Sequence, residues 1–395
     1  MKGEDILMNY LELAKGIEEY TRTFRRELHM YPELSGQEFE TQKKIMRELD
    51  KLGIPYRKVG TTSLVATLKG GKPGKTVALR GDIDALPVKE ESGVEFASKT
   101  EGVMHACGHD AHTAMLLSAA KLLNDRKDDI KGEVRFFFQE AEETFSGAEK
   151  IIADGGMDGV DAAFGMHGMP HLKVGEASIE SGYRMAGCDT IYLKFEGVSG
   201  HGSMPHMSKD SIHAAAQFTT ELQSIITKQN DAQDPLVLSV GRFHGGTKAN
   251  IIAKYTELDI SMRYFTPEAR KVAHDGIRRL AKSIADLWEI KVEVEIEESA
   301  LSLYNDPDLT ELARTSFTKV AGEDGLQHVP KMMGSEDMPY YFQKAPGVYA
   351  LMGYRNDDIE AIYFPHHEKF KIDEEYMKYG VALHVQFAMD FLNRE

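Results

Sequence analysis

The most restrictive feature of this sequence is the alternation of short apolar strands with amphipathic helices over its first half. Residues 76–80, 133–138 and 162–165 are expected to be buried strands. Residues 38–52 and 113–123 carry apolar side chains at helical spacing. Strands that alternate with helices in this way predict an α/β fold with helices on both faces of a central mixed sheet.

The pattern changes after about Met185 and returns after Ala300. The intervening elements are expected to be a strand at 190–196, a helix at 211–228, strands at 236–243 and 256–264, a helix at 267–288 and a strand at 291–297. This β-α-β-β-α-β order predicts a smaller α+β domain of the ferredoxin-like type. We therefore expect a split catalytic domain, residues 1–185 and 300–395, around an inserted domain at 186–299.

Polar side chains follow each of the three strands of the first half. Asp82 and Asp84 come after the first strand, Glu142 and Glu143 after the second, and His167 after the third. In open α/β sheets, ligands bind outside the carboxyl ends of the strands. The sequence therefore predicts that these groups face one crevice.

Residues 104–112 hold three histidines, a cysteine and an aspartate. A thiolate at Cys107 and an imidazole at His109 are suitable ligands for zinc-like ions. Gly108 between them allows the backbone to turn sharply enough for both side chains to face one ion. This segment indicates a metal site that needs further ligands from elsewhere in the chain.

Together these patterns give five candidate metal ligands: Cys107, His109, Glu143, His167 and His366. Their thiolate, imidazole and carboxylate groups suit Zn, Mn, Co or Ni better than Mg or Ca. Two such ions about 3.5–4 Å apart would hold and activate a shared water. The neighbouring Glu142 would then take a proton from that water and pass it to a leaving amine.

Plainer interpretations stay open for the individual residues. The pair Glu142 and Glu143 alone is also typical of a solvated face, and Asp82 and Asp84 could form a turn with Pro87. The second cysteine of the chain, Cys188, has no ligand pattern around it and is expected to be a buried small apolar residue.

Composition excludes several classes of function. The net charge of −16 argues against nucleic acid or an anionic membrane as a partner, since both need a basic face. No run of apolar residues approaches the length of a spanning helix, and the N-terminus lacks the pattern of a signal peptide. Two cysteines give no disulfide framework, so we expect a cytoplasmic protein.

Seven segments carry a resemblance to a known family. They occur in this order: RGDIDALP, MHACGHDAH, QEAEETFSGA, FGMHG, SGHGSMPH, GGTKANII and GSEDM. Together they resemble the metal-dependent aminoacylase and carboxypeptidase amidohydrolases, in the branch of hippurate hydrolase and the indole-acetyl-amino-acid hydrolases. The resemblance runs from about Leu28 to Asp373.

The resemblance implies a role for each matching residue of the catalytic domain. The family's metal ligands match Cys107, His109, Glu143, His167 and His366, the last of these aligned by Phe370. The general base matches Glu142, and the aspartate near the metals matches Asp84, which would orient a ligand.

The resemblance also makes the inserted domain a lid and dimerisation domain. His201 matches a histidine that such enzymes send across a dimer interface to stabilise the oxyanion, so a homodimer or higher homo-oligomer is expected. Asn250 and Arg263 match positions that contact the carboxylate end of the substrate. His201 is otherwise a histidine in a glycine-rich loop, and His206 is a nearby rival.

The chain departs from the family pattern at two places. Glu140 stands where a proline is usual, and residues 367–369 replace a common Ser-Pro pair. The second departure leaves His367 as an alternative to His366. Both are expected to lie near the pocket and to bear on substrate preference.

The resulting expectation is hydrolysis of the amide bond of an N-acyl amino acid or a small dipeptide-like amide, with two divalent ions per subunit. Two other classes remain as alternatives. One is a hydrolase with Cys107 as nucleophile and His109 or His112 as base. The other is a non-catalytic binding protein on the same scaffold, against which the presence of Glu142 argues.

Overall fold

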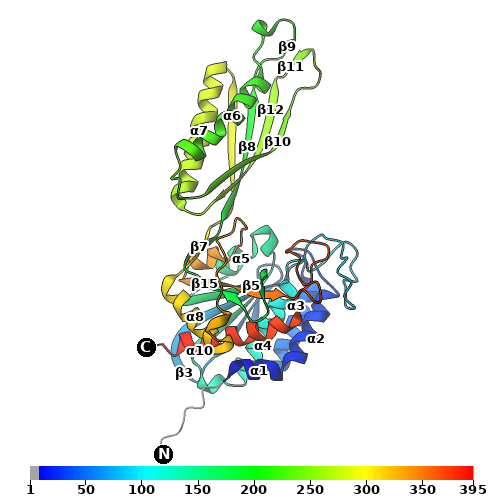
Figure 1. Cartoon of the computed structure of the whole chain (residues 1–395), viewed down its shortest axis with the longest axis vertical. Helices are drawn as coiled ribbons and strands as arrows, with labels where there is room; N and C mark the ends of the chain where they lie inside the picture. The colour runs from blue at the N-terminus through cyan, green and yellow to red at the C-terminus, as the bar shows by residue number, and fades with distance from the viewer. Residues whose placement is uncertain (1–8, 395) are drawn as a thin grey trace, which may run out of the picture. The chain divides into compact units, whose positions relative to one another are not determined.

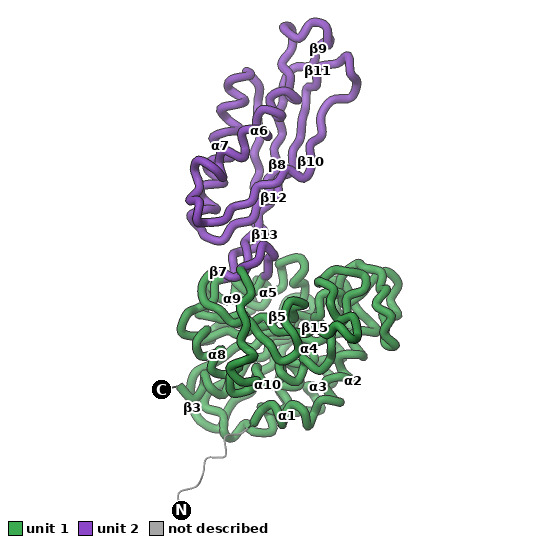
Figure 2. Tube along the Cα trace, in the orientation of Figure 1, with its two compact units in different colours: residues 1–182, 304–330, 337–395 green, residues 183–303, 331–336 purple. Residues whose placement is uncertain are grey.

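The computed structural model describes residues 9–394, which form two compact units (Figure 2). The first unit runs to Gly182 and includes Tyr304–Pro330 and the chain from Asp337 onward. The second comprises Tyr183–Leu303 and Lys331–Glu336. The division expected from the sequence falls near these bounds, and its functional labels remain a prediction.

The first unit is built on a seven-stranded sheet in the order β1-β2-β4-β3-β5-β15-β6. The strands are β1 (Tyr56–Val59), β2 (Ser63–Lys69), β3 (Lys72–Asp82), β4 (Lys131–Gln139), β5 (Ala162–Lys173), β6 (Ala177–Ser178) and β15 (Gly347–Arg355). The central four strands β4, β3, β5 and β15 are parallel, and β1, β2 and β6 run antiparallel to their neighbours. The sheet is therefore mixed, as expected from the sequence.

Helices lie on both faces of this sheet, and one face is the more fully covered (Figure 1). One layer consists of α1 (Tyr10–Gly16), α2 (Glu18–His29), α3 (Phe39–Leu52), α4 (His109–Asn124), α8 (Pro307–Ala321) and α10 (Met377–Leu392). Phe136 and Phe138 of β4 belong to the apolar core that these helices share with the sheet. The intervening Phe137 lies on the other face, where its ring contacts Tyr341 of the short helix α9 (Pro339–Phe342). Another short helix, α5 (Gly147–Ala153), packs beside α9.

Helix α4 begins four residues before the helix expected at 113–123. It follows Gly108, whose φ of 88° is the left-handed conformation that glycine adopts most easily. The first turn holds the polar residues His109, Asp110 and His112, all of them buried. Apolar spacing identified only the part of the helix that faces the core and therefore missed this polar turn.

Strand β5 continues to Lys173 instead of ending at Gly165. The expectation that His167 follows the strand is therefore wrong, since it lies within β5. The reason is the parallel pairing with β15, in which His167 lies opposite Leu351. This ladder supplies partners for a stretch whose glycine, histidine and proline residues resemble a loop in sequence.

The second unit contains a four-stranded antiparallel sheet in the order β10-β12-β8-β13. Its elements are β8 (Gly187–Glu196), α6 (Ser211–Lys228), β10 (Leu236–Gly245), β12 (Tyr255–Tyr264), α7 (Pro267–Trp288) and β13 (Lys291–Ala300). This is the predicted β-α-β-β-α-β order. Both helices begin after a residue type that is favoured at the N-cap. The side chain of Asp210 accepts backbone hydrogen bonds at the start of α6, and that of Thr266 does so at the start of α7.

Short elements complete the described chain. They are β7 (Gly182–Met185), β9 (Gly200–His201), β11 (Ile251–Ile252), β14 (Leu303–Asn305) and the 3-10 helices η1 (Lys127–Asp129), η2 (Glu142–Thr144), η3 (Pro205–Met207), η4 (Glu323–Gly325) and η5 (Glu374–Tyr376). No helix within residues 9–394 is both long and apolar enough to cross a membrane.

Candidate metal centre

The candidate site forms where two parallel strands end side by side. Asp82, the last residue of β3, lies opposite Gln139, the last residue of β4. The chain after β4 enters η2, which carries Glu142 and Glu143. Because the carboxyl ends of neighbouring parallel strands share one edge, the polar loops that follow them lie together.

A strained turn presents the two glutamates of η2. Ala141 before it and Phe145 after it both have a positive φ, 52° and 53°, which is uncommon for residues other than glycine. The buried carboxylate of Glu38 holds this turn by accepting hydrogen bonds from the backbone N–H of Ala141, at 3.0 Å, and of Gly36, at 2.8 Å. Its other oxygen accepts from the hydroxyl of Thr62.

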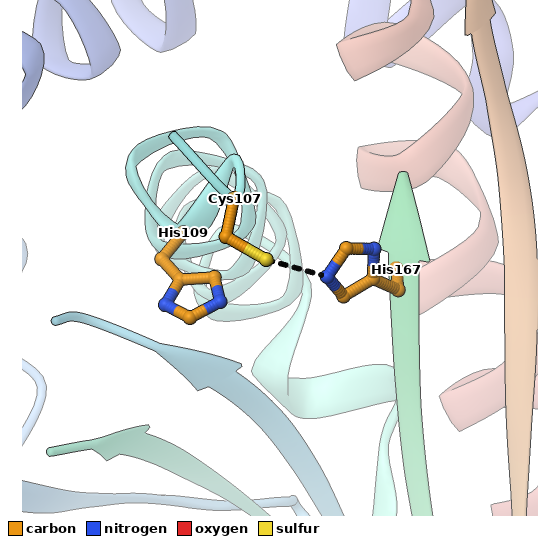
Figure 3. Close-up of side chains that lie close together, drawn as sticks. All are labelled: Cys107, His109 and His167. Carbon is orange, nitrogen blue, oxygen red and sulfur yellow. Dashed lines mark hydrogen bonds between the residues drawn. The ribbon is translucent and has the colours of Figure 1, made fainter. Parts of the chain in front are cut away.

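All five predicted metal ligands of the first unit converge (Figure 3 shows three of them). The donor atoms form the overlapping groups Cys107–His109–His167, Cys107–Glu143–His366 and His109–Glu142–Glu143, with the atoms of each group within 4.8 Å of one another. The Cys107 Sγ lies 3.3 Å from His167 Nε2, and His366 Nε2 lies 3.3 Å from Glu143 Oε1. Overlapping groups of this kind are what two neighbouring ions require.

Hydrogen bonds at Nδ1 aim two of these histidines at the cluster. His109 Nδ1 lies 3.0 Å from a carboxylate oxygen of Asp84, and His167 Nδ1 lies 2.7 Å from the backbone oxygen of Gly168. Each ring therefore turns its Nε2 toward the other donor atoms. His109 Nε2 and Glu143 Oε1 are buried and make no hydrogen bond. Buried polar atoms without such a partner are costly, so the donor set fits bound cations.

The backbone distinguishes His366 from its neighbour. His366 has a φ of 72°, and its N–H donates to the backbone oxygen of Ala106 at 2.7 Å. This places its ring at Glu143. The ring of His367 instead packs against Tyr363, with the centroids 4.5 Å apart and the ring planes tilted by 30°, and its Nδ1 accepts from a backbone N–H. The geometry favours His366 as the fifth ligand.

The electrostatics of the cluster also suit cations. Burial raises the pKa of the Cys107 thiol, and burial lowers the pKa of His167 to about 4, which keeps that imidazole neutral. Burial opposes a charge on His109, but the neighbouring Asp82 and Cys107 raise its pKa well above the usual range. The protons on Cys107 and His109 therefore supply positive charge that a divalent cation would supply when bound.

Sequence reasoning missed a second layer of contacts around Asp82. Its carboxylate lies 2.7 Å from His112 Nδ1 and accepts from Arg80 at 2.7 Å. His112 Nε2 accepts from the N–H of Gly168, the residue after His167. The available signal was helical spacing, which places His112 on the same face as His109.

The buried Glu140 does not face the metal ligands, contrary to the expectation that it alters the pocket. Its carboxylate accepts from the backbone N–H groups of Thr61, Thr62 and Ser63 and pairs with Lys150. These contacts attach the end of β4 to the start of β2, so the role of Glu140 is structural.

The remaining predicted residues lie in the second unit. His201 in β9 is exposed, and Asn250 lies beside it, because its backbone oxygen accepts from the N–H of Gly202. Arg263 lies opposite Cys188 in the ladder of β12 and β8. Asn250 precedes the first residue of β12, Tyr255. Arg263 lies eight residues farther along that strand than Tyr255, which is about 26 Å at the usual rise per residue. Within this unit the structure groups His201 with Asn250 but not with Arg263.

Comparison with known proteins identifies this arrangement. Residues 78–390 match the model of the family described as peptidase family M20/M25/M40. The chain belongs to peptidase family M20/M25/M40. This confirms the resemblance seen in the sequence motifs, and with it the α/β fold class and the assignment to the hydrolases.

Relatives with assigned names support the assignment to the M20 family. Thermostable carboxypeptidase 2 of Saccharolobus solfataricus is 40% identical over 386 residues, covering 96% of this chain and 98% of that protein. An N-acyl-L-amino acid amidohydrolase of Geobacillus stearothermophilus is 44% identical over 265 residues, covering 67% and 72%. The crystal structure of Bacillus subtilis YxeP, described as a dinuclear metal-binding peptidase of family M20, superposes with a TM-score of 0.85 at 35% identity and covers 96% of this chain and 99% of that one.

We predict that Glu38→Ala weakens metal binding, although Glu38 is not a ligand. Its loss leaves the buried N–H of Ala141 without an acceptor, at a cost of about 1–3 kcal/mol, removes the acceptor of the part-buried N–H of Gly36, and releases the turn that carries Glu143. We expect metal affinity to fall on the order of 10- to 100-fold. Titration of the metal-free protein with Zn²⁺, together with urea unfolding, measures both effects.

Glu38→Gln is the matched control, because its amide oxygen can still accept both N–H groups. It should restore most of the affinity. A folded Glu38→Ala protein that binds Zn²⁺ as tightly as the parent would show that the turn holds its shape without Glu38.

Proposed function

We propose that this protein hydrolyses the amide bond of N-acyl amino acids by a metal-assisted attack of water. The observation that carries the proposal is the position of Glu142. Its buried carboxylate lies beside the ligand cluster, with Oε2 3.8 Å from His109 Nε2, and Glu142 directly precedes the candidate ligand Glu143. The name of the Geobacillus relative supports the substrate class.

The five residues Cys107, His109, Glu143, His167 and His366 would hold two divalent cations. Thiolate, imidazole and carboxylate groups suit Zn, Mn, Co or Ni. When bound, such a pair supplies Lewis-acid polarisation of the amide carbonyl and lowers the pKa of a water molecule toward neutrality. The donor set therefore fits this group of four metals.

The protein side chains would then manage the protons and the charge. Glu142 takes a proton from the attacking water and delivers it to the nitrogen of the leaving amine. Asp84 keeps the ring of His109 oriented through its hydrogen bond. His201 from a second copy of the chain donates to the developing oxyanion, a contribution of about 3–4 kcal/mol to the barrier.

Asn250 and Arg263 would bind the free carboxylate of the amino acid. The two residues lie far apart in the second unit, as the length of β12 shows. One copy of that unit therefore cannot present both side chains to the same carboxylate. If both residues take part, they come from different copies, which agrees with a homodimer as the working form.

The structure bears on the alternative of a cysteine nucleophile. A nucleophilic thiol is activated by a lowered pKa. Burial instead raises the pKa of the Cys107 thiol. Cys107 is also within 4.8 Å of four other candidate donor atoms across its two groups. The proximity of these donor atoms supports a ligand role for Cys107, in which a bound cation would stabilise the thiolate.

The first prediction from this proposal concerns the base. Glu142→Gln should lower kcat by at least about 100-fold, because a general base contributes roughly 10²- to 10⁴-fold, while two metal ions per chain remain bound. Hydrolysis of N-acetylated and N-benzoylated amino acids, with metal analysis of the same samples, measures both. Glu149→Gln, an exposed glutamate of α5, is the control that should keep full activity. Full turnover by Glu142→Gln would refute the assignment.

The second prediction concerns the dimer. Mixing inactive Glu142→Ala and His201→Ala chains under subunit exchange should restore activity, because a heterodimer contains one intact composite site. Random exchange in a two-fold dimer gives about a quarter of the parental activity. Mixing Glu142→Ala with Glu143→Ala should restore none, since both changes lie in the same unit. Verified exchange without recovery would mean that His201 does not act across an interface.

The third prediction separates a ligand thiolate from a nucleophile. Iodoacetamide should modify Cys107 in metal-free protein and should be blocked by saturating metal, because the sulfur is then coordinated. Peptide mass analysis follows the modification, with the buried Cys188 as the internal reference. Equal modification of the metal-loaded enzyme, with matching loss of activity, would favour the nucleophile.

A further inference from the structure

One area of the large sheet presents charged side chains instead of a packed apolar surface. In the ladder of β1, β2 and β4, Arg57 lies opposite Val65, Thr67 opposite Arg135, and Lys69 opposite Glu133. Directly paired residues point to the same face, and alternate residues of one strand share it. These side chains therefore occupy one face of the sheet, the face that also carries Phe137.

Helices cover only part of this face. The short helices α5 and α9 pack at the end near the candidate metal centre, where Phe137 contacts Tyr341. Toward the other end of β2 and β4, the side chains line a cavity of about 660 Å³.

The cations of the cavity are mostly unpaired. Arg57 and Lys69 lie on the sheet and Lys127 lies in η1, all three lining the cavity and exposed. Within residues 9–394 none of these three side chains has a hydrogen bond or an ion pair. Two carboxylates also line the cavity, and that of Glu133 is engaged by Arg135 at 2.7 Å. Unpaired cations that gather in one cavity are notable in a chain of net charge −16.

The cavity is separate from the candidate metal centre. Glu133 lies six residues before Gln139, the end of β4 that leads to the metal ligands, which is about 20 Å along the strand. Asn124, which also lines the cavity, ends α4, whose first residue is His109. The cavity is therefore at the opposite end of both elements from the ligands.

We propose that this cavity binds a small polyanion, a molecule with two or more carboxylate or phosphate groups. Its volume lies within the range of about 300–1,000 Å³ of small-molecule sites. Arg57 and Lys69 contact separate anionic groups from the sheet, and Lys127 closes the site from η1. The half-buried hydroxyl of Thr67 lies between them on the same face and provides a neutral donor. The site is independent of the hydrolytic chemistry proposed above.

The test is calorimetric titration of the metal-loaded protein with two weakly chelating probes, tricarballylate as a tricarboxylate and 3-phosphoglycerate as a phosphate ester. We expect at least one probe to bind. Replacing Arg57 and Lys69 together by Gln should raise its Kd on the order of tenfold or more for each cation removed. The probe that binds tells which anionic group the site prefers.

Lys58→Gln is the matched control, because Lys58 is the neighbour of Arg57 on β1 and points to the opposite face. It should leave Kd unchanged. Equal melting temperatures of the three proteins would confirm that the folds are intact. The proposal is wrong if neither probe binds, if Lys58→Gln has the same effect as the double variant, or if the double variant binds the probe as the parent does, since the anion would then lie elsewhere, for instance at the metals.

Discussion

The buried carboxylate of Asp84 is the contact on which the candidate site depends. One of its oxygens lies 3.0 Å from His109 Nδ1, and the other accepts from the N–H of Glu143 and from the hydroxyl of Ser35. These bonds join the segment after β3 to the first residue of α4, to the turn after β4 and to the segment before α3. Ligands from separate parts of the sequence are thereby held in fixed relation before any ion binds.

The buried acidic groups of the site are balanced by neighbouring groups of opposite charge. Asp82 is fully buried, and burial alone would raise its pKa, yet the charges of His109 and Arg80 hold that pKa well below the usual range. Arg80 also contacts Asp337, at 2.8 Å. An uncompensated buried charge is costly, so each acidic group near the ligands needs such a partner. The cluster is stable as a network and not as a set of separate pairs.

The sequence predicted the fold class, the helices α6 and α7 and the convergence of Cys107 with His109, because hydrophobic periodicity and ligand spacing are local properties. The position of His167 inside β5 was not predictable in this way, since only pairing with β15 makes that stretch a strand. The contact of His112 with Asp82 and the structural role of Glu140 were missed for the same reason. They depend on which loops meet in space, and residue type alone does not reveal that.

The direction of α4 has a consequence for the charge that the site needs. The helix begins at His109, so the positive end of its dipole faces the place where cations would bind. This end of a helix favours anions, and it therefore opposes a metal ion. The buried carboxylates of Asp82 and Asp84 lie beside this turn and reduce that unfavourable potential, whereas the buried Asp110 is paired with Arg25 and His29. An equivalent site at the C-terminus of a helix would not need acidic side chains for this purpose, because the dipole there already favours a cation.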